Sequence, residues 1–461
     1  MKDIVLILSD QHAWAYTGFE DSRLDTPNLE RIAKEGCVYE RCYCNAPLCV
    51  PSRMSFLTGL LPSQLGIFNN DTTIPTDMPT IAHAMGTAGY ETVLIGRMHF
   101  KGDDQKHGFD VHLAGDITSQ YWGTGGKDRA DFGAYAGTAN RKHCLELVGG
   151  GCSPVMAYDE NVMETAVKFL EDNLGREGRP PLFLVIGFYG PHFPFVSSPD
   201  LYEKYKERLK AGWNSSSLQA LPWYEDYVQI CDEEKRAHCQ AAYYGLIETL
   251  DRYVGQLYDL FCGWEQKAGH ESLFIYTSDH GEQLGKRGIF GKQTLYEDAL
   301  RVPLIVSDSA AETSNIRIQR PVSLLDVRNM ILNAAGYREG DSTVAASPVR
   351  IQQILEYRGE FLMGEAVILF PYKIIRIGNQ ERVYNLETDS QEEQDIASEC
   401  QDILKQARQY FLSDSEKEAC LKNEKKQRER HERLKAWGKV KRPEEWAVFK
   451  VPLRACQKPE E

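Results

Sequence analysis

The sequence of 461 residues lacks long hydrophobic runs, CxxC cysteine pairs and an excess of positive charge. The apolar run at residues 4–8 is too short for the hydrophobic region of a signal peptide. No window approaches the roughly 18 uninterrupted apolar residues of a membrane-spanning helix. We therefore expect a cytoplasmic protein without a membrane partner. The formal net charge of -14 repels nucleic acid, so we expect no nucleic-acid partner either, and an anionic substrate requires a local group of cations.

The cysteine spacing and the chain length set the expected redox state and domain number. Twelve cysteines are scattered along the chain, and the only close pair is Cys42-x-Cys44, which favours reduced thiols over a disulfide framework. Because one hydrophobic core stops growing near roughly 250 to 300 residues, we expect one large domain and a smaller one. The polar segment at 338–348 places the boundary near 345, between a domain of residues 1–345 and one of residues 346–461.

Buried strands alternate with helical patterns along the first domain. This alternation is typical of an α/β fold with a large mixed, mostly parallel sheet covered by helices on both faces. Strands are expected at residues 4–8, 92–95, 182–188, 273–277 and 304–306. Helices are expected at 246–261, where apolar residues recur at spacings of three and four, and at 322–335.

The second domain is expected to be a smaller α+β unit. Residues 361–384 resemble short antiparallel strands, and residues 400–442 are strongly helical and charged. The run at 425–430 has two open interpretations, a solvated helix face or a partner-binding surface, and the first is favoured. The charged helices also leave a homo-oligomer open.

Polar side chains suited to catalysis follow four of the expected strands. The carboxyl ends of parallel strands meet at one edge of a sheet, where strand-to-helix loops converge. We therefore expect these side chains to share one site. In chain order they are Asp10, Arg97, His99, His192, Asp279 and His280.

The sharpest local signal is residues 49–59, which read Cys-Val-Pro-Ser-Arg-Met-Ser-Phe-Leu-Thr-Gly. A lone cysteine is more often a small buried hydrophobe. Here Pro51 suits the first turn of a helix, which places Cys49 beside free backbone N–H groups and the positive end of the helix dipole. Arg53 adds a fork of donors that matches a tetrahedral oxyanion. The pattern therefore predicts an anion-binding turn around Cys49.

With this motif the chain resembles the type I, formylglycine-dependent sulfatases of the alkaline phosphatase superfamily. Residues 49–59 match the family signature Cys-x-Pro-Ser-Arg-x-x-x-Leu-Thr-Gly at every fixed position. The resemblance covers about residues 3–397 and implies an alkaline-phosphatase-like fold. Residues 98–109 most resemble the branch that holds choline sulfatases and phosphonate monoester hydrolases. Further family motifs are matched, in order, by residues 9–11, 96–100, 189–194, 277–281, 291–297 and 383–389.

The resemblance implies two non-standard components of the site. One is formylglycine, made from Cys49 by a maturation enzyme. The other is one divalent metal held by Asp10, Gln11, Asp279 and His280, although most relatives carry an aspartate where this chain has Gln11. Oxygen-rich ligation favours Ca²⁺ first and Mg²⁺ second, and the imidazole leaves Mn²⁺ and Zn²⁺ open.

The resemblance also implies a mechanism in which hydrated formylglycine at position 49 attacks sulfur and displaces the alcohol. Arg53 and Arg97 would balance charge on the sulfuryl oxygens, although Arg97 stands where relatives have lysine. His99 would take a proton from the second hydroxyl, so that sulfate leaves and the aldehyde is restored. The group at the leaving oxygen would be His192, alone or together with Lys292, and Lys292 would also balance charge on the sulfuryl oxygens.

Three questions stay open at this point. Asn70 is a loose match to an asparagine that touches the transferred group in the nearest branch. The alternatives to a sulfatase are a phosphonate monoester hydrolase or phosphodiesterase using the same site, and a binding protein with an inactive sulfatase fold. The small sulfated substrate is an aryl, steroid, choline or sugar sulfate. Tyr121, Trp122 and Phe132 either line its pocket or belong to the core, and the core is favoured.

Overall fold

The computed structural model describes residues 2–124, 143–176, 178–209, 218–268, 271–311, 314–338 and 348–452. Phe132 and the expected boundary near 345 lie outside these ranges. No helix in the ranges has the length and apolar character that crossing a membrane requires. All the cysteines within them are free thiols, which agrees with the prediction from their spacing.

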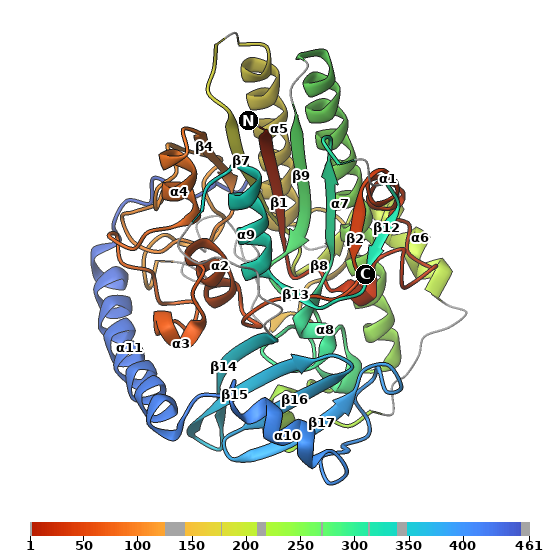
Figure 1. Ribbon diagram of the computed structural model, residues 1–461, viewed down its shortest axis with the longest axis vertical. Coiled ribbons are helices and arrows are strands. Elements are labelled where there is room, and N and C mark those ends of the chain that lie inside the picture. Colours follow the sequence, from red (N-terminus) through yellow and green to blue (C-terminus); the bar gives the residue numbers. More distant parts are fainter. Residues whose placement is uncertain are drawn as a thin grey trace.

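A sheet of eight strands forms the centre of the large domain (Figure 1). Its strands lie in the order β12 (Ile316–Ile318), β2 (Cys37–Tyr39), β11 (Leu304–Asp308), β9 (Ser272–Ser278), β1 (Asp3–Asp10), β7 (Leu182–Pro191), β4 (Glu91–Gly96) and β5 (Val111–Leu113). β1 pairs in parallel with both β7 and β9, whereas β11 is antiparallel to β9. The mixed, mostly parallel sheet and all five expected strands are therefore confirmed.

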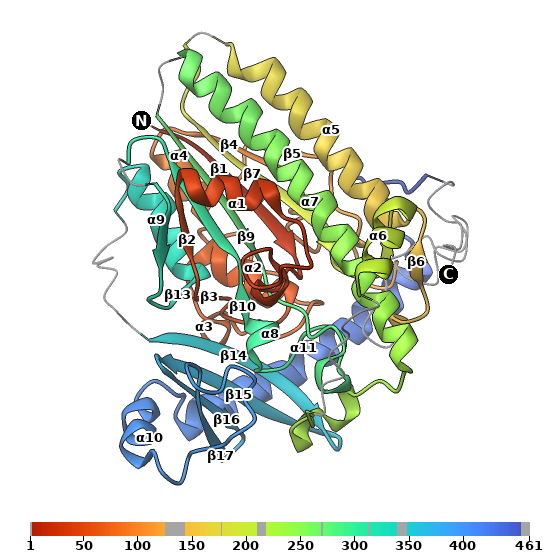
Figure 2. The same ribbon diagram turned by 90° about the vertical axis from the view of Figure 1, so that its right-hand side faces the viewer.

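Helices cover both faces of this sheet (Figure 2). Side chains alternate along β1, so that Val5 and Ile7 pack on one face while Ile4, Leu6 and Leu8 pack on the other. The first face is covered by α1 (Pro27–Glu35), α5 (Pro154–Leu174) and α7 (Glu233–Ala268). The second is covered by α2 (Cys49–Thr58), α4 (Ile81–Thr87) and α9 (Leu324–Ala334).

Shorter elements complete the large domain. The helix expected at 322–335 begins two residues later, because residues 322 and 323 form a short strand that pairs with residues 42 and 43. The short strands are β3 (Cys42–Tyr43), β10 (Arg301–Val302) and β13 (Val322–Ser323) in one sheet, and β6 (Val148–Gly150) and β8 (Phe195–Ser197) in another. The remaining helices are α3 (Pro62–Leu65), α6 (Pro199–Leu209) and α8 (Glu297–Leu300).

The smaller C-terminal unit is an antiparallel sheet with two helices, as the sequence predicts. Its strands are β14 (Val349–Tyr357), β15 (Glu360–Leu369), β16 (Tyr372–Ile377) and β17 (Gln380–Asn385), followed by α10 (Gln401–Arg408) and α11 (Asp414–Lys441). Lys373 on β16 is fully buried and forms ion pairs with Glu297 of the large domain at 3.0 Å and with Glu392 at 2.7 Å. This buried pair links the small sheet to the segment that begins α8.

Helix α11 runs along the outside of the molecule from the small sheet toward the large domain (Figure 1). The charged run at 425–430 is mainly exposed, which both a solvated face and a partner-binding surface require. The same helix nevertheless buries a stripe composed of Lys417, Cys420, Glu424, His431 and Gly438. Because most of these residues are polar, a search for hydrophobic periodicity does not detect this packing face.

Candidate active site

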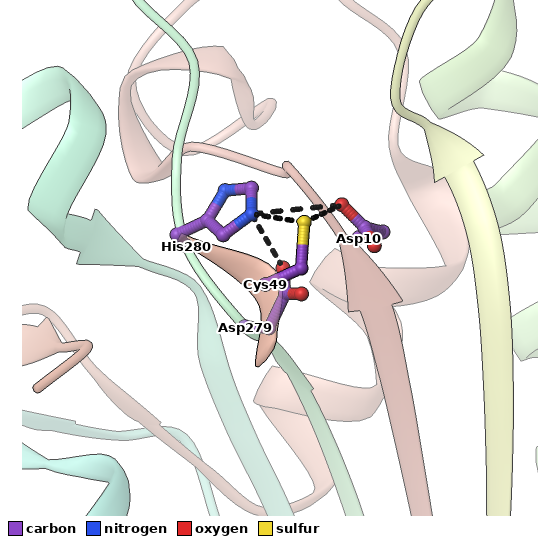
Figure 3. A group of neighbouring side chains, drawn as sticks. All are labelled: Asp10, Cys49, Asp279 and His280. Carbon is purple, nitrogen blue, oxygen red and sulfur yellow. Dashed lines mark hydrogen bonds and ion pairs between the residues drawn. The ribbon is translucent and has the colours of Figure 1, made fainter. Parts of the chain in front are cut away.

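Cys49, the candidate nucleophile, is the first residue of α2 and lies beside the ends of two central strands (Figure 3). Asp10 ends β1, and Asp279 directly follows β9, which pairs with β1 in parallel register. The strand pairing therefore brings Asp10 and Asp279 together. Pro51 lies in the first turn of α2, as expected, so the helix N-terminus faces these carboxylates.

Four side chains form a compact, fully buried cluster (Figure 3). The Cys49 Sγ atom lies 3.7 Å from Asp10 Oδ1 and 3.2 Å from His280 Nε2. His280 Nε2 in turn lies 3.6 Å from Asp10 Oδ1 and 3.5 Å from Asp279 Oδ1. One ligand atom from each of the four residues lies within 4.8 Å of all the others.

The donor set of this cluster fits a divalent cation. His280 Nδ1 faces the Gly281 carbonyl at 3.1 Å, and since a carbonyl only accepts, the ring proton belongs on Nδ1. The Nε2 lone pair is then free to face the two carboxylates, the arrangement that metal-binding histidines use. Burial opposes ionisation of Asp10, yet nearby cations, Arg97 foremost, hold its pKa well below the usual value. Asp10 is therefore an ionised carboxylate, the form that a metal ligand requires.

Two buried arginines hold the carboxylates in place. Arg53 donates from Nε to Asp279 Oδ2 at 2.8 Å and from Nη2 to Asp10 Oδ2 at 3.2 Å, so one guanidinium bridges both. Arg97 donates from Nε to Asp10 Oδ2 at 2.7 Å and stacks over Tyr189, with the guanidinium carbon 4.4 Å from the ring centre. A lysine ammonium at either position lacks this fork of donors.

Asp116 is a site residue that the sequence analysis missed. Its Oδ1 accepts from Arg97 Nη1 at 2.9 Å, and its Oδ2 accepts from the backbone N–H of His99 at 3.0 Å. The residue lies shortly after β5, so an aspartate near the end of a parallel strand was the available signal. Asp116 fixes the turn that carries both Arg97 and His99.

His99 adopts a left-handed backbone conformation with φ of 65°. Such a conformation is uncommon outside glycine and often marks functional sites. Its Nδ1 accepts from Arg97 Nη2 at 2.6 Å, which places the ring proton on Nε2. Burial and the charge of Arg97 lower the pKa of His99 well below its usual value, so the ring is neutral. Because Arg97 occupies the Nδ1 lone pair, His99 can accept a proton only after its hydrogen bond with Arg97 breaks.

Lys292 and His192 form a second polar pair, whose side-chain nitrogens are 2.6 Å apart. Burial and the neighbouring Lys292 lower the pKa of His192 well below its usual value. The neutral ring therefore accepts at Nε2, while Nδ1 donates to the Phe193 carbonyl at 2.7 Å. His192 is therefore the acceptor in its hydrogen bond with Lys292.

Gln11 connects the lysine to a further buried residue that the sequence analysis missed. Gln11 has a left-handed φ of 70°, its Oε1 accepts from Lys292 Nζ, and its Nε2 donates to Glu282. Glu282 also accepts the backbone N–H groups of Leu284 and Gly291, at 2.7 and 2.5 Å. As placed, the amide oxygen of Gln11, expected as a metal ligand, contacts the lysine.

The Asn70 side chain lies against the N-terminus of α2, and its contact with a transferred group stays a prediction. Its Oδ1 accepts from the backbone N–H of Val50 at 3.0 Å. Tyr121 and Trp122 are half-buried and contact α11, through Trp437 and His431 respectively, rather than forming part of a main core. The core interpretation is therefore wrong for these two aromatic residues, and their role in a pocket stays a prediction.

Comparison with known proteins identifies relatives of this chain. The family model described as Sulfatase matches residues 2–337. A choline-sulfatase from Rhizobium meliloti (strain 1021) is 32% identical over 338 residues, covering 68% of this chain and 63% of the relative. An arylsulfatase from Clostridium perfringens (strain 13 / Type A) is 28% identical over 339 residues, covering 66% of this chain and 68% of the relative. The chain thus spans slightly less than two thirds of the length of the first relative.

Solved structures share the fold. The phosphonate monoester hydrolase of Agrobacterium radiobacter superposes with a TM-score of 0.68 at 17% identity, covering 89% of this chain and 95% of that chain. A structure described as a 2-O GAG sulfatase superposes with a TM-score of 0.65 at 17% identity, covering 89% and 90%. At these identities the similarity establishes a shared fold and leaves the substrate open.

Proposed function

Because the chain belongs to the sulfatase family, we propose that it hydrolyses a sulfate monoester to an alcohol and inorganic sulfate at the Cys49 site. One observation carries this proposal. The Cys49 side chain projects from a helix N-terminus into a buried cluster of two carboxylates, an imidazole and two arginines. Such a cluster provides a nucleophile position, a metal position and fixed positive charge within one hydrogen-bonded network.

We propose that the active form carries formylglycine at position 49. Burial, followed by the charge of Asp10, raises the pKa of the unmodified thiol to about 11, so an unmodified Cys49 is almost entirely protonated near neutral pH. A protonated thiol is a poor nucleophile. Oxidation to an aldehyde, which hydrates to a gem-diol, supplies hydroxyl groups at the same place. The maturation enzyme expected from the family would perform this conversion.

Asp10, Asp279 and His280 are the residues that would hold the metal, with Ca²⁺ favoured by the two carboxylates. The bound metal would polarise a sulfate oxygen and lower the pKa of a hydroxyl at position 49. Arg53 and Arg97 keep the carboxylates at fixed positions and offset part of their charge. The contact of Gln11 with Lys292 supports a role for this amide in orienting the lysine.

The Lys292 and His192 pair would contact the leaving-group oxygen of the sulfate ester. Because His192 is neutral and accepts from Lys292, the ammonium is the donor that can hydrogen-bond or protonate the departing alcohol. His192 then sets the direction of the ammonium. His99 remains the group assigned to the release of sulfate, and its contact with Arg97 makes that release dependent on movement of the arginine or the ring.

A phosphonate monoester hydrolase is the second candidate. The superposition on such an enzyme with a TM-score of 0.68 motivates this alternative, and phosphonate monoesters offer the same tetrahedral geometry as sulfate esters. The similarity to a choline-sulfatase and an arylsulfatase supports a small sulfate ester in first place. Turnover of an aryl sulfate and of an aryl phosphonate, measured on the same preparation, separates the two activities.

The decisive experiment combines peptide mass with activity. Trypsin releases residues 42–53, which include Cys42, Cys44 and Cys49. We expect a peptide that has lost one sulfur and two hydrogens and gained one oxygen at position 49. The Cys49→Ala variant should then lose aryl sulfate hydrolysis, whereas Cys44→Ala, a matched buried thiol in the same peptide, should retain it. An active protein with unmodified Cys49 would rule out the formylglycine mechanism.

A further inference from the structure

The chain returns to the active-site region after α11. The backbone N–H of Asp116 donates to the Ala447 carbonyl at 2.8 Å, and the backbone N–H of Phe449 donates to the Asp116 carbonyl, also at 2.8 Å. Together these bonds form a parallel bridge between Asp116 and Val448. A segment more than 300 residues later in the sequence therefore pairs with one residue of the active-site support.

This C-terminal segment, residues 445–451, is anchored rather than loosely attached. Ala447, Val448 and Val451 are buried, and Val451 belongs to the core on the α5 and α7 face of the sheet. The Phe449 ring packs edge-on against Tyr158 at 5.5 Å, and the Tyr158 hydroxyl donates to the Gly115 carbonyl at 2.8 Å. The segment thus holds both the backbone of Asp116 and the residue before it.

The main chain and the side chain of Asp116 have different partners. The main chain is bonded to the C-terminal segment, whereas the carboxylate is bonded to Arg97 Nη1 and to the backbone N–H of His99. Asp116 is fully buried, and Arg97 contacts the candidate metal ligand Asp10 through Nε at 2.7 Å. A continuous series of hydrogen bonds therefore leads from residues 447 and 449 to the metal cluster.

We propose that the C-terminal segment 445–451 is a positioning element of the active site, acting through Asp116 on Arg97 and His99. This inference rests on the proposed sulfatase function. The segment contributes no group to the chemistry. It fixes the backbone from which the Asp116 carboxylate extends, and a displacement of about 1 Å in such a support is sufficient to lower turnover about 10²-fold. The small C-terminal unit thereby becomes necessary for the geometry of the large domain.

The test removes one hydrogen bond of the bridge and measures whether the resulting loss of activity depends on the Asp116 carboxylate. Phe449→Pro eliminates the N–H that donates to Asp116. Lys450→Pro is the matched control, because no hydrogen bond from its N–H is among those of the described residues, and its side chain is exposed. Gly115→Ala perturbs the same contact from the other side, since an added Cβ would lie 2.3 Å from the Ala447 carbonyl oxygen. Each variant is combined with Asp116→Asn.

We expect Phe449→Pro and Gly115→Ala to lower kcat by about 10- to 100-fold with little change in KM, and to cause no further loss in the Asp116→Asn background. Lys450→Pro should stay close to the parent. The inference would be overturned if the double variants lost kcat by the product of the two single-variant factors. It would also be overturned if Phe449→Pro and Lys450→Pro lowered kcat equally. If Phe449→Pro fails to fold, the cycle with Gly115→Ala decides.

Hydrogen exchange separates this inference from the proposed function. In the parent protein, amides of residues 96–101 should exchange slowly, and Phe449→Pro should accelerate them while Lys450→Pro does not. This result would support the positioning element even if the parent turned over no sulfate ester, in which case the proposed function alone would fail. Unchanged exchange at residues 96–101 in Phe449→Pro would overturn the inference whatever the activity.

Discussion

The replacement of Arg53 by lysine separates the geometry of this site from its charge. The guanidinium is fully buried and donates to Asp279 at 2.8 Å, to Asp10 at 3.2 Å and to the Arg97 carbonyl at 3.0 Å. A lysine keeps the positive charge but donates from one atom, so it cannot bridge two carboxylates in this fork. Each lost hydrogen bond to a charged group lowers the free energy of unfolding by about 1.5 to 3 kcal/mol. The loss of two such bonds therefore lowers it by at most about 3 to 6 kcal/mol.

The consequence for function follows from the freed carboxylates. Partners that orient metal ligands typically contribute about 10- to 100-fold in metal affinity or activity, and we expect Arg53→Lys to weaken Ca²⁺ binding by this factor. The assay is a Ca²⁺ titration by calorimetry on the matured protein, with aryl sulfate turnover measured across the same free-metal range. Saturating metal should restore part of the lost turnover.

Arg376→Lys provides the matched control for this prediction. Arg376 donates from Nε to Glu365 at 3.1 Å in the small domain, away from the candidate metal site. Its replacement should lower stability but leave Ca²⁺ affinity unchanged. Arg53 does not orient the metal ligands if Arg53→Lys binds Ca²⁺ as tightly as the parent, or if Arg376→Lys weakens Ca²⁺ binding equally.

Three further predictions follow from the same geometry. Lys292→Met should lower hydrolysis of an alkyl sulfate about 10²- to 10³-fold, but that of a nitrophenyl sulfate far less, because a good leaving group needs no proton donor; equal losses would remove Lys292 from that role. Chelation of the metal should abolish turnover and lower the melting temperature. Added Ca²⁺ at 100 times its Kd should stabilise the fold by about 2.7 kcal/mol. A melting temperature that stays unchanged when Ca²⁺ is added back would contradict the proposed metal position. Asn70→Ala should leave the Val50 N–H without its acceptor and lower kcat more than Asn69→Ala, which removes a contact to α11; the opposite order would exclude Asn70 from the site.

The strands and the family motifs were predictable because their signals are local. The runs that became β1, β4, β7 and β9 are continuous apolar segments, and the polar residues after them meet because parallel strands end at one edge. The sequence also placed Cys49 at the start of a helix through Pro51. The assigned roles of the site residues stay predictions until the variants are measured.

Features that depend on distant segments were not predictable in this way. Glu282 resembles an ordinary loop carboxylate in the sequence, and only its contact with Gln11 identifies it. Asp116 has the weak signal of following a strand, and its contact with Arg97 is what distinguishes it from other aspartates in loops. For the aromatic residues Tyr121 and Trp122 the sequence favours the core over a substrate pocket, but both residues contact α11 instead. Their position depends on a helix about 300 residues later in the chain.

The sequence by itself therefore determined the family, the order of the central strands along the chain and the residues that surround Cys49. Each of these is written in short runs whose spacing carries its own physical signal. The tertiary structure alone decided which ring nitrogen of His99, His192 and His280 carries the proton, because that depends on the partner each ring meets. It also decided that the C-terminal segment supports the active site, because two backbone hydrogen bonds between distant segments leave no pattern in the order of the amino acids.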